Sequence, residues 1–276
     1  MSKLFYNRLH LTGKGEIKNK NVFYFDGLRS EAAVGENNHS YKITDVTQTG
    51  DYILGYLVKY DPYGRGEYLD DKTGKVRQGG TKNNIIAKSL FILNVDESLI
   101  AFEEVPNIIS KHQFRRVFSE LFRENHGGNV KEFSITGITE QYSFIEKVKT
   151  LTKIKQINIS LVPSNPRNAD LWRDTDERLR ENNITSYREV MISTDPEGLI
   201  VDEETIGKMA MAEDGYGESE ARGLDNEGHN VVINTTGRKQ ELTQNLPNEV
   251  EIAGTVSIID FVKNMFKKVA SRTDKA

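Results

Sequence analysis

Hydrophobic and polar positions follow two different periods along this chain, and together they predict both strands and helices. Apolar residues recur at strand spacing in residues 52–60 (YILGYLVKY), which end in a turn-forming Asp-Pro-Tyr-Gly run. Two further strand-like runs, separated by Asp96 and Glu97, predict a hairpin over residues 89–105. Helical spacing is clearest in residues 108–123, where the apolar side chains fall on one stripe: Ile109, Phe114, Val117, Phe118, Leu121 and Phe122.

The same criteria place the other elements. Strands are predicted at residues 4–12, 22–25, 130–136, 155–162, 187–194 and 250–256, with a second hairpin at 221–235. Helices are predicted at residues 140–151, 170–182, 202–214 and 257–272, and Asp202 is the expected N-cap of the third. Residues 29–40 and 65–84 show neither period and are predicted to be loops, the second rich in glycine, lysine and arginine.

The order of these elements predicts an α+β fold. Residues 89–162 follow the order β-β-α-β-α-β, and the last five elements suggest a ferredoxin-like mixed sheet with helices on one face. The strand at 155–162 ends in the proline-rich turn of residues 163–167, and the chain becomes acidic beyond that turn. We therefore expect an N-terminal α+β sheet domain at residues 1–165 and a smaller acidic α/β region at residues 166–276, which closes with an amphipathic helix.

Composition narrows the functional classes. The 276 residues are 28% charged and 37% hydrophobic, which is typical of a folded soluble protein. Cysteine is absent, and this excludes disulfides, thiolate zinc sites, iron–sulfur clusters and a cysteine nucleophile. No apolar run is long enough for a transmembrane segment, and the first ten residues lack the apolar core of a secretory signal. A cytoplasmic location is the expectation.

Charge is distributed unevenly. Residues 107–160 contain 9 Lys/Arg and 5 Asp/Glu, a net charge of +4, whereas residues 170–252 contain 8 Lys/Arg and 20 Asp/Glu, a net charge of −12. Residues 261–276 contain 5 Lys/Arg and 1 Asp, again +4. The asymmetry suggests a polyanion-binding face next to an acidic face, and the alternative is that both are ordinary solvated surfaces.

The basic residues of this region are the candidate nucleic-acid-binding residues. They lie on two predicted helices, on the strand that follows them and just past its end: Lys111, Arg115, Arg116, Arg123, Lys147, Lys149, Lys153, Lys155 and Arg167. On one surface they would contact phosphates with salt-sensitive affinity and little base selectivity. Tyrosines near the glycine-rich loop, at positions 52, 56, 60, 63 and 68, would either stack on bases or belong to the core.

Enzymatic chemistry has less support in the sequence. The five histidines are widely separated and never at metal-ligand spacing, so we expect neither a metal nor a cofactor. Neither a phosphate-binding loop nor a nucleophile elbow occurs. A metal-dependent nuclease or other hydrolytic effector is the alternative, with Asp174, Asp176 and Glu203 among its acids.

Three segments of the second half also resemble a bacterial family of domains of unknown function: residues 157–172, 176–193 and 208–236. The resemblance is carried by the elements Pro163–Arg167, Glu181–Asn183, Met209–Gly215, Gly217–Gly223, Asp225–Gly228 and Thr235–Thr236. After Thr236 the chain departs from the family pattern. The resemblance implies a cytoplasmic bacterial protein, some of whose relatives lie in phage-defence gene neighbourhoods, and it assigns no catalytic residues.

These observations lead to one principal hypothesis and two alternatives. The principal one is a non-enzymatic component of an antiphage defence system that binds DNA, RNA or a partner defence protein through the basic face. The hydrolytic effector is the first alternative. The second is an oligomerising scaffold, in which the apolar stripe of the helix at 257–272 packs on a second copy of the chain and not on its own domain.

Overall fold

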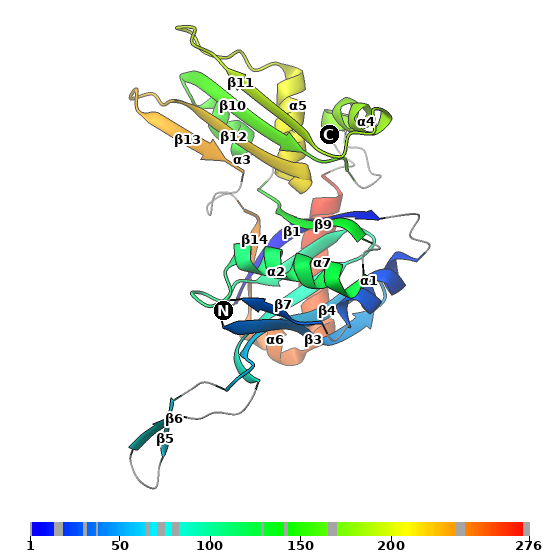
Figure 1. Ribbon diagram of the computed structural model, residues 1–276. Helices are drawn as coiled ribbons and strands as arrows, with labels where there is room; N and C mark the ends of the chain where they lie inside the picture. The colour runs from blue at the N-terminus through cyan, green and yellow to red at the C-terminus, as the bar shows by residue number, and fades with distance from the viewer. Residues whose placement is uncertain are drawn as a thin grey trace.

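The computed structural model describes residues 2–13, 19–29, 32–36, 38–64, 67–70, 75–78, 83–127, 130–140, 143–164, 170–235 and 241–272. These residues form two main antiparallel sheets with helices packed on them, so the fold is α+β (Figure 1). An eight-stranded sheet forms the lower body in Figure 1, and a four-stranded sheet with its own helices lies above it.

Strand β1 (Ser2–Gly13) organises the large sheet. It pairs with β8 on one side, and with β14 and then β9 on the other. The strand order is β14-β1-β8-β7-β4-β3-β2, with β9 beside the second half of β1. The bounds are β2 (Val34–Glu36), β3 (His39–Thr49), β4 (Tyr52–Asp61), β7 (Asn84–Asn94), β8 (Leu99–Glu103), β9 (Val130–Gly137) and β14 (Thr243–Leu246).

Helices cover both faces of the large sheet because its strands are apolar on both sides. Along β4, Ile53 and Leu57 face the core under α1 (Lys20–Leu28) and α2 (Lys111–Asn125). Leu54 points to the opposite face, where the apolar stripe of α7 (Thr255–Ala270) packs. The C-terminal helix therefore packs on the large sheet, and not on the acidic region to which the sequence assigned it. Helix α6 (Asn248–Ala253) leads into α7, and no helix in the described residues has the length and apolar character needed to cross a bilayer.

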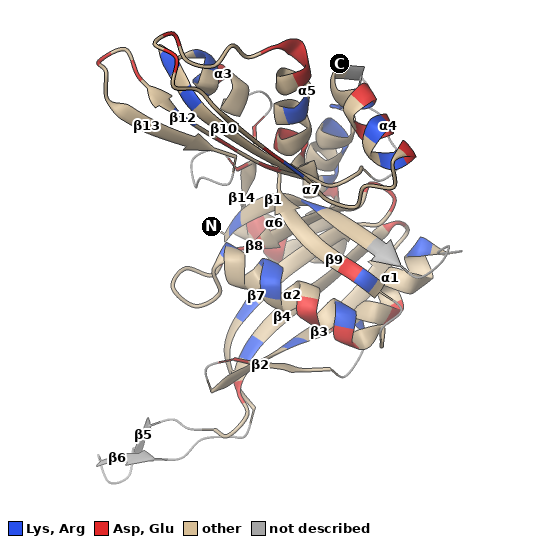
Figure 2. Cartoon of the chain, turned by 45° about the horizontal axis from the view of Figure 1, so that its top comes forward, with Lys and Arg blue, Asp and Glu red and all other residues tan. Residues whose placement is uncertain are grey.

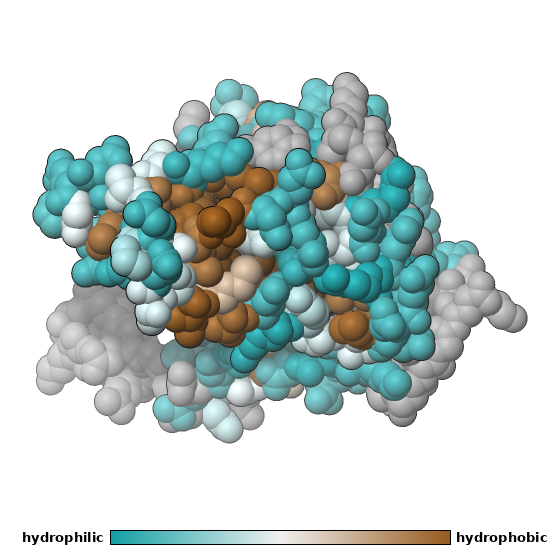
Figure 3. All heavy atoms as spheres, turned by 90° about the horizontal axis from the view of Figure 1, so that it is seen from above, coloured by the Kyte–Doolittle hydropathy of each residue, from teal (hydrophilic) through white to brown (hydrophobic). Residues whose placement is uncertain are grey.

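The four-stranded sheet and its helices form what we call the small lobe. Strand β10 (Lys153–Leu161) lies between β11 (Tyr187–Ile192) and β12 (Gly217–Leu224), and β13 (Asn230–Asn234) pairs with β12. One face of this sheet is covered by helices: α3 (Ser143–Lys149), the short η1 (Asp170–Trp172), α4 (Arg173–Glu181) and α5 (Glu203–Met211), which continues into the π turn η2 (Ala212–Tyr216). Seen from above, apolar side chains gather in places on this lobe (Figure 3).

Most predicted elements are confirmed, including β4, the β7–β8 hairpin, α2 and the N-cap at Asp202, whose side chain accepts from Thr205 N at 2.8 Å. The predicted strand at 22–25 is wrong, because those residues lie in α1. Its first turn is capped by Asn19, and Tyr24 and Leu28 are buried at helical spacing.

Three other regions also differ from expectation. The predicted loop at 29–40 contains β2 and the start of β3, which pair with each other. The predicted strand at 250–256 falls in α6 and the start of α7, and the strand of this region is β14 instead. The predicted loop at 65–84 contains strands β5 (Glu67–Asp70) and β6 (Lys75–Gln78), which pair with each other.

The ferredoxin-like arrangement is not confirmed. The order β-β-α-β-α-β is present between β7 and β10, but β9 pairs with β1 of the large sheet, whereas β10 pairs with β11 and β12. The boundary expected after residue 165 falls inside the segment that builds the small lobe. The chain then returns to the large sheet through β14 and α7.

Candidate functional site

Helix α2 presents its polar side chains along one edge of the large sheet. Ser110 caps the helix by accepting from Gln113 N at 3.2 Å, and the apolar stripe around Phe114 and Phe118 is fully buried. With that stripe facing the sheet, the side chains at three- and four-residue spacing beside it point toward β9. They are His112, Arg115, Arg116, Ser119 and Arg123.

These side chains line a groove of about 500 Å³, which we call the α2–β9 groove. Residues 133–137 of β9 form its second wall, and Glu218 of β12 lies at its small-lobe end. Among the described strands β9 pairs with β1 alone, so its other edge is free. In an antiparallel pair, alternate residues direct their N–H and C=O groups away from the partner strand. The groove therefore combines cationic side chains with a free strand edge.

Two cations at this site belong to the interior. Lys111 Nζ and Arg115 Nη2 both bind the carboxylate of Glu241, the latter at 2.9 Å, and the Lys111 and Glu241 side chains are 3% and 1% exposed. Arg115 Nε also donates to Asn7 Oδ1 at 2.8 Å. A buried pair of this kind joins α2 to the segment before β14 and leaves Lys111 unable to reach a ligand.

Arg116 and Arg123 are the accessible cations of the groove. Arg116 is half exposed and pairs with Glu36 at 2.5 Å and Glu120 at 3.7 Å. Burial alone would raise the pKa of the Glu36 carboxyl, but hydrogen bonds from Gln113 and Arg116 outweigh it, and the net pKa is lowered. Arg123 is exposed and donates from Nε to Ser119 O at 3.3 Å. Exposed pairs such as these exchange readily for a ligand carboxylate or phosphate.

The remaining predicted cations lie elsewhere. Lys147 and Lys149 are exposed on α3, and Lys153 and Lys155 are on β10, so all four belong to the small lobe. Arg167 lies outside the described residues. Both basic and acidic residues occur along α2, and β9 contains one of each, Lys131 and Glu132 (Figure 2). The structure thus brings Arg115, Arg116 and Arg123 together and does not join them to the lysines of the small lobe.

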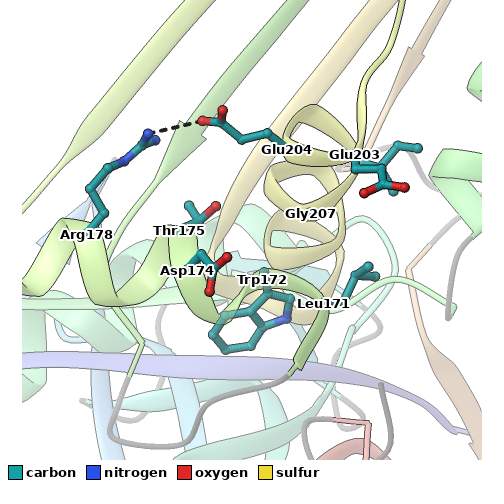
Figure 4. A pocket seen from close by; sticks show the side chains of 9 residues that line it. Leu171, Trp172, Asp174, Thr175, Arg178, Glu203, Glu204 and Gly207 are labelled. Carbon is teal, nitrogen blue, oxygen red and sulfur yellow. Dashed lines mark hydrogen bonds and ion pairs between the residues drawn. The ribbon is translucent and has the colours of Figure 1, made fainter.

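The acids of the hydrolytic alternative do not converge. Asp174 and Glu203 line a pocket of about 780 Å³ between α4 and α5, which Arg178 and Glu204 span with a 3.1 Å ion pair (Figure 4). Asp176 is fully buried outside this lining, where its carboxylate accepts from the backbone and side chain of residue 164 and from residue 180. Within the described residues no group of three or more His, Asp or Glu side chains is placed to hold a metal ion.

The sequence analysis missed a buried ionic cluster between the large sheet and the small lobe. Arg8 of β1 donates from Nε to the Asp214 carbonyl at 2.7 Å, and its guanidinium lies 4.4 Å from the centre of the Tyr216 ring. Trp172 Nε1 donates to the Asp214 carboxylate at 3.0 Å. Arg272, just past the end of α7, is buried close enough to stabilise that carboxylate. The cluster joins four segments of the chain at the lobe junction.

Burial changes the protonation of this junction. It raises the pKa of Glu213 to about 7 and also raises the pKa of Asp214. It lowers the pKa of His10, whose Nε2 lies 2.7 Å from the Gly215 carbonyl, to about 4. Gly215 has φ +85°, and a Cβ there would lie 3.0 Å from the Arg8 Cβ, so glycine permits the close approach. The acidic pair directly before this glycine is the sequence signal that could have identified the junction.

The comparisons with known proteins concern the chain as a whole. A family model described as a domain of unknown function, DUF4747, matches residues 28–263, which is more than half of the chain. The match includes α2, β9, all of the small lobe and the first half of α7. No curated protein matches the chain.

Proposed function

The chain belongs to the DUF4747 family, and we propose that this member is a binding component of a bacterial antiphage system that captures an extended acidic segment of a partner protein in the α2–β9 groove. The observation that carries the proposal is the edge of β9 beside Arg116 and Arg123, which no described strand pairs with. The antiphage context rests on the family resemblance of the second half of the chain.

Strand addition is the binding mode that this edge favours. An incoming strand would pair its backbone with the outward N–H and C=O groups of β9, and main-chain hydrogen bonds would supply affinity. Alternate side chains of that strand would face α2. Arg116 and Arg123 lie two turns apart along the helix, so carboxylates at alternating positions of the strand could meet both.

A protein segment suits the groove better than a nucleic-acid backbone. Arg116 already has two carboxylate partners, and Glu218 lies at the end of the groove. A phosphodiester chain needs a continuous positive surface, because it carries a charge at every nucleotide. A peptide needs positive charge only where its own carboxylates fall, so the mixed charge of the walls is compatible with selective peptide binding.

Fluorescence anisotropy with labelled peptides tests the proposal. An acidic peptide that alternates glutamate with valine should bind, and a lysine–valine peptide of the same length should not. R116A/R123A should weaken binding roughly tenfold, since exposed charge contacts contribute about 0.2–1 kcal/mol each. K147A/K149A removes the same charge from α3 and should bind as the unaltered protein does.

The same variants test the biological context. In cells that the protein protects from phage, R116A/R123A should lose protection and K147A/K149A should keep it. Equal weakening of peptide binding by both double variants would refute the groove as the site. Binding of duplex DNA or RNA that is lost only in R116A/R123A would show that the groove takes polyanions instead.

A further inference from the structure

A second surface, on the opposite face of the large sheet, has a different chemistry. Helix α7 covers Leu54, Leu90 and Ile92 on this face, and the sheet extends beyond that cover. There a depression of about 450 Å³ is lined mainly by Lys42, Thr44, Tyr60, Ile85 and Lys88. We call this surface the lysine–tyrosine face. It shares no residue with the α2–β9 groove.

Strand register explains why basic and aromatic side chains gather here. Lys42 of β3 pairs with Val58 of β4, and Val58 pairs with Lys88 of β7, so the two lysines flank one valine on adjacent strands. Tyr56 and Tyr60 lie two residues to either side of Val58, which places both on the same face. Lys88 Nζ is 5.7 Å from the centre of the Tyr56 ring.

The tyrosines of β4 differ in how deeply they are buried. Tyr52 stacks on Phe266 of α7, with ring centres 6.2 Å apart. Tyr56 and Tyr60 are only half buried, and Ile85, which pairs with Tyr60, is 53% exposed. Tyr60 therefore lines the depression beyond the cover of α7, whereas Tyr56 packs at the edge of the α7 cluster with Lys88 beside its ring.

The segment that follows β4 in the sequence is basic. Strands β4 and β7 end at Asp61 and Asn84, and the segment that connects them contains the β5–β6 hairpin. Residues 65–84 contain 5 Lys/Arg and 3 Asp/Glu, a net charge of +2.

We propose that the lysine–tyrosine face binds single-stranded nucleic acid, with phosphates on Lys42 and Lys88 and bases stacked on Tyr60 and Tyr56. Single strands expose both groups at once, whereas a duplex hides the faces of its bases. Asp45 lies 3.9 Å from Lys88, and both side chains are well exposed. Its carboxylate competes with the ligand for that lysine and limits affinity.

Anisotropy with fluorescein-labelled oligo(dT) and oligo(rU) of about 12 nucleotides, a length within the usual range of single-strand sites, tests this inference. Y60A should weaken binding about tenfold with little change in salt dependence, because stacking involves no counterion release. K42A/K88A should reduce the slope of log affinity against log salt by about 1.4, at about 0.7 per phosphate contact in a single strand. D45N should tighten binding, and asparagine is well tolerated at the φ of +54° found there.

K147A/K149A is the matched control, since it removes the same charge from α3. It should leave both the affinity and the salt slope unchanged. Absence of binding at low salt, or equal loss in K42A/K88A and K147A/K149A, would overturn the inference, as would equal affinity for a duplex. Circular dichroism and the urea midpoint establish that each variant is folded. R116A/R123A should bind oligonucleotides normally, so failure here is distinguishable from failure of the peptide proposal.

Discussion

Replacement of Glu241 by alanine should destabilise the protein strongly. Its carboxylate is the shared partner of Lys111 and Arg115, and the side chains of Glu241 and Lys111 are 1% and 3% exposed. In E241A the Lys111 ammonium stays buried with no counterion, whereas Arg115 keeps Asn7 and some access to water. Removal of one partner from a buried ion pair costs about 3–5 kcal/mol, and we expect a loss in that range.

Urea unfolding followed by far-ultraviolet circular dichroism measures this loss as a change in the free energy of unfolding. E120A is the matched control, because it removes a carboxylate 3.7 Å from Arg116 at an exposed position. The control should lose less than about 1 kcal/mol.

A double variant separates loss of the pair from loss of packing. In K111M/E241A the uncompensated charge is gone, and an apolar chain fills the space of the lysine stem. Since replacement of a buried ion pair by apolar side chains is often close to neutral, the double variant should recover at least half of the loss. A loss in E241A below about 1 kcal/mol, or a double variant no more stable than E241A, would refute the electrostatic explanation.

Three further predictions concern the small lobe and its junction. Because burial raises the pKa of Glu213 from 4.5 to about 7, the folded state binds this proton more tightly, and stability falls as pH rises through that window. E213Q should remove that fall, so at pH 8 its free energy of unfolding should be higher than that of the unaltered protein by on the order of 3 kcal/mol. In urea unfolding the difference should vanish near pH 4, and an equal difference at both pH values would contradict this. D176A should cost about 1–3 kcal/mol, since it removes the buried carboxylate that accepts from Ser164 N and Oγ, whereas D174A at the exposed pocket rim should stay within about 0.5 kcal/mol. D202A should lower the thermal midpoint by removing an N-cap worth about 1 kcal/mol, and D202N should retain most of it.

Local sequence patterns were sufficient for elements whose structure depends only on residues close together in the sequence. The apolar stripe of α2 and the alternation along β4 follow from the side-chain periods of a helix and a strand, and both elements form as predicted. The aromatic run at 22–25 misled the prediction, because strand propensity reflects packing against neighbours. In this chain residues 23 and 24 belong to α1, and their aromatic neighbours are Phe122 of α2 and Phe133 of β9.

The candidate site was predictable only in part. Arg115, Arg116 and Arg123 share one helix, so their proximity follows from sequence spacing alone. Their separation from Lys147, Lys149, Lys153 and Lys155 depends on the division of β9 and β10 between two sheets, a pairing choice between distant segments. The neutralisation of Lys111 and Arg115 depends on Glu241, more than a hundred residues away in the chain.

The sequence by itself determined most element types, the α+β class, the charge asymmetry and the row of polar side chains on α2, because these depend on side-chain chemistry and short-range periodicity. Only the tertiary structure decided which strands share a sheet, which cations are buried, that one edge of β9 is unpaired among the described strands, and that two lysines and two tyrosines meet on the lysine–tyrosine face. Those features arise from pairing between segments distant in the chain. The energy of each pairing depends on packing and desolvation that no local pattern contains.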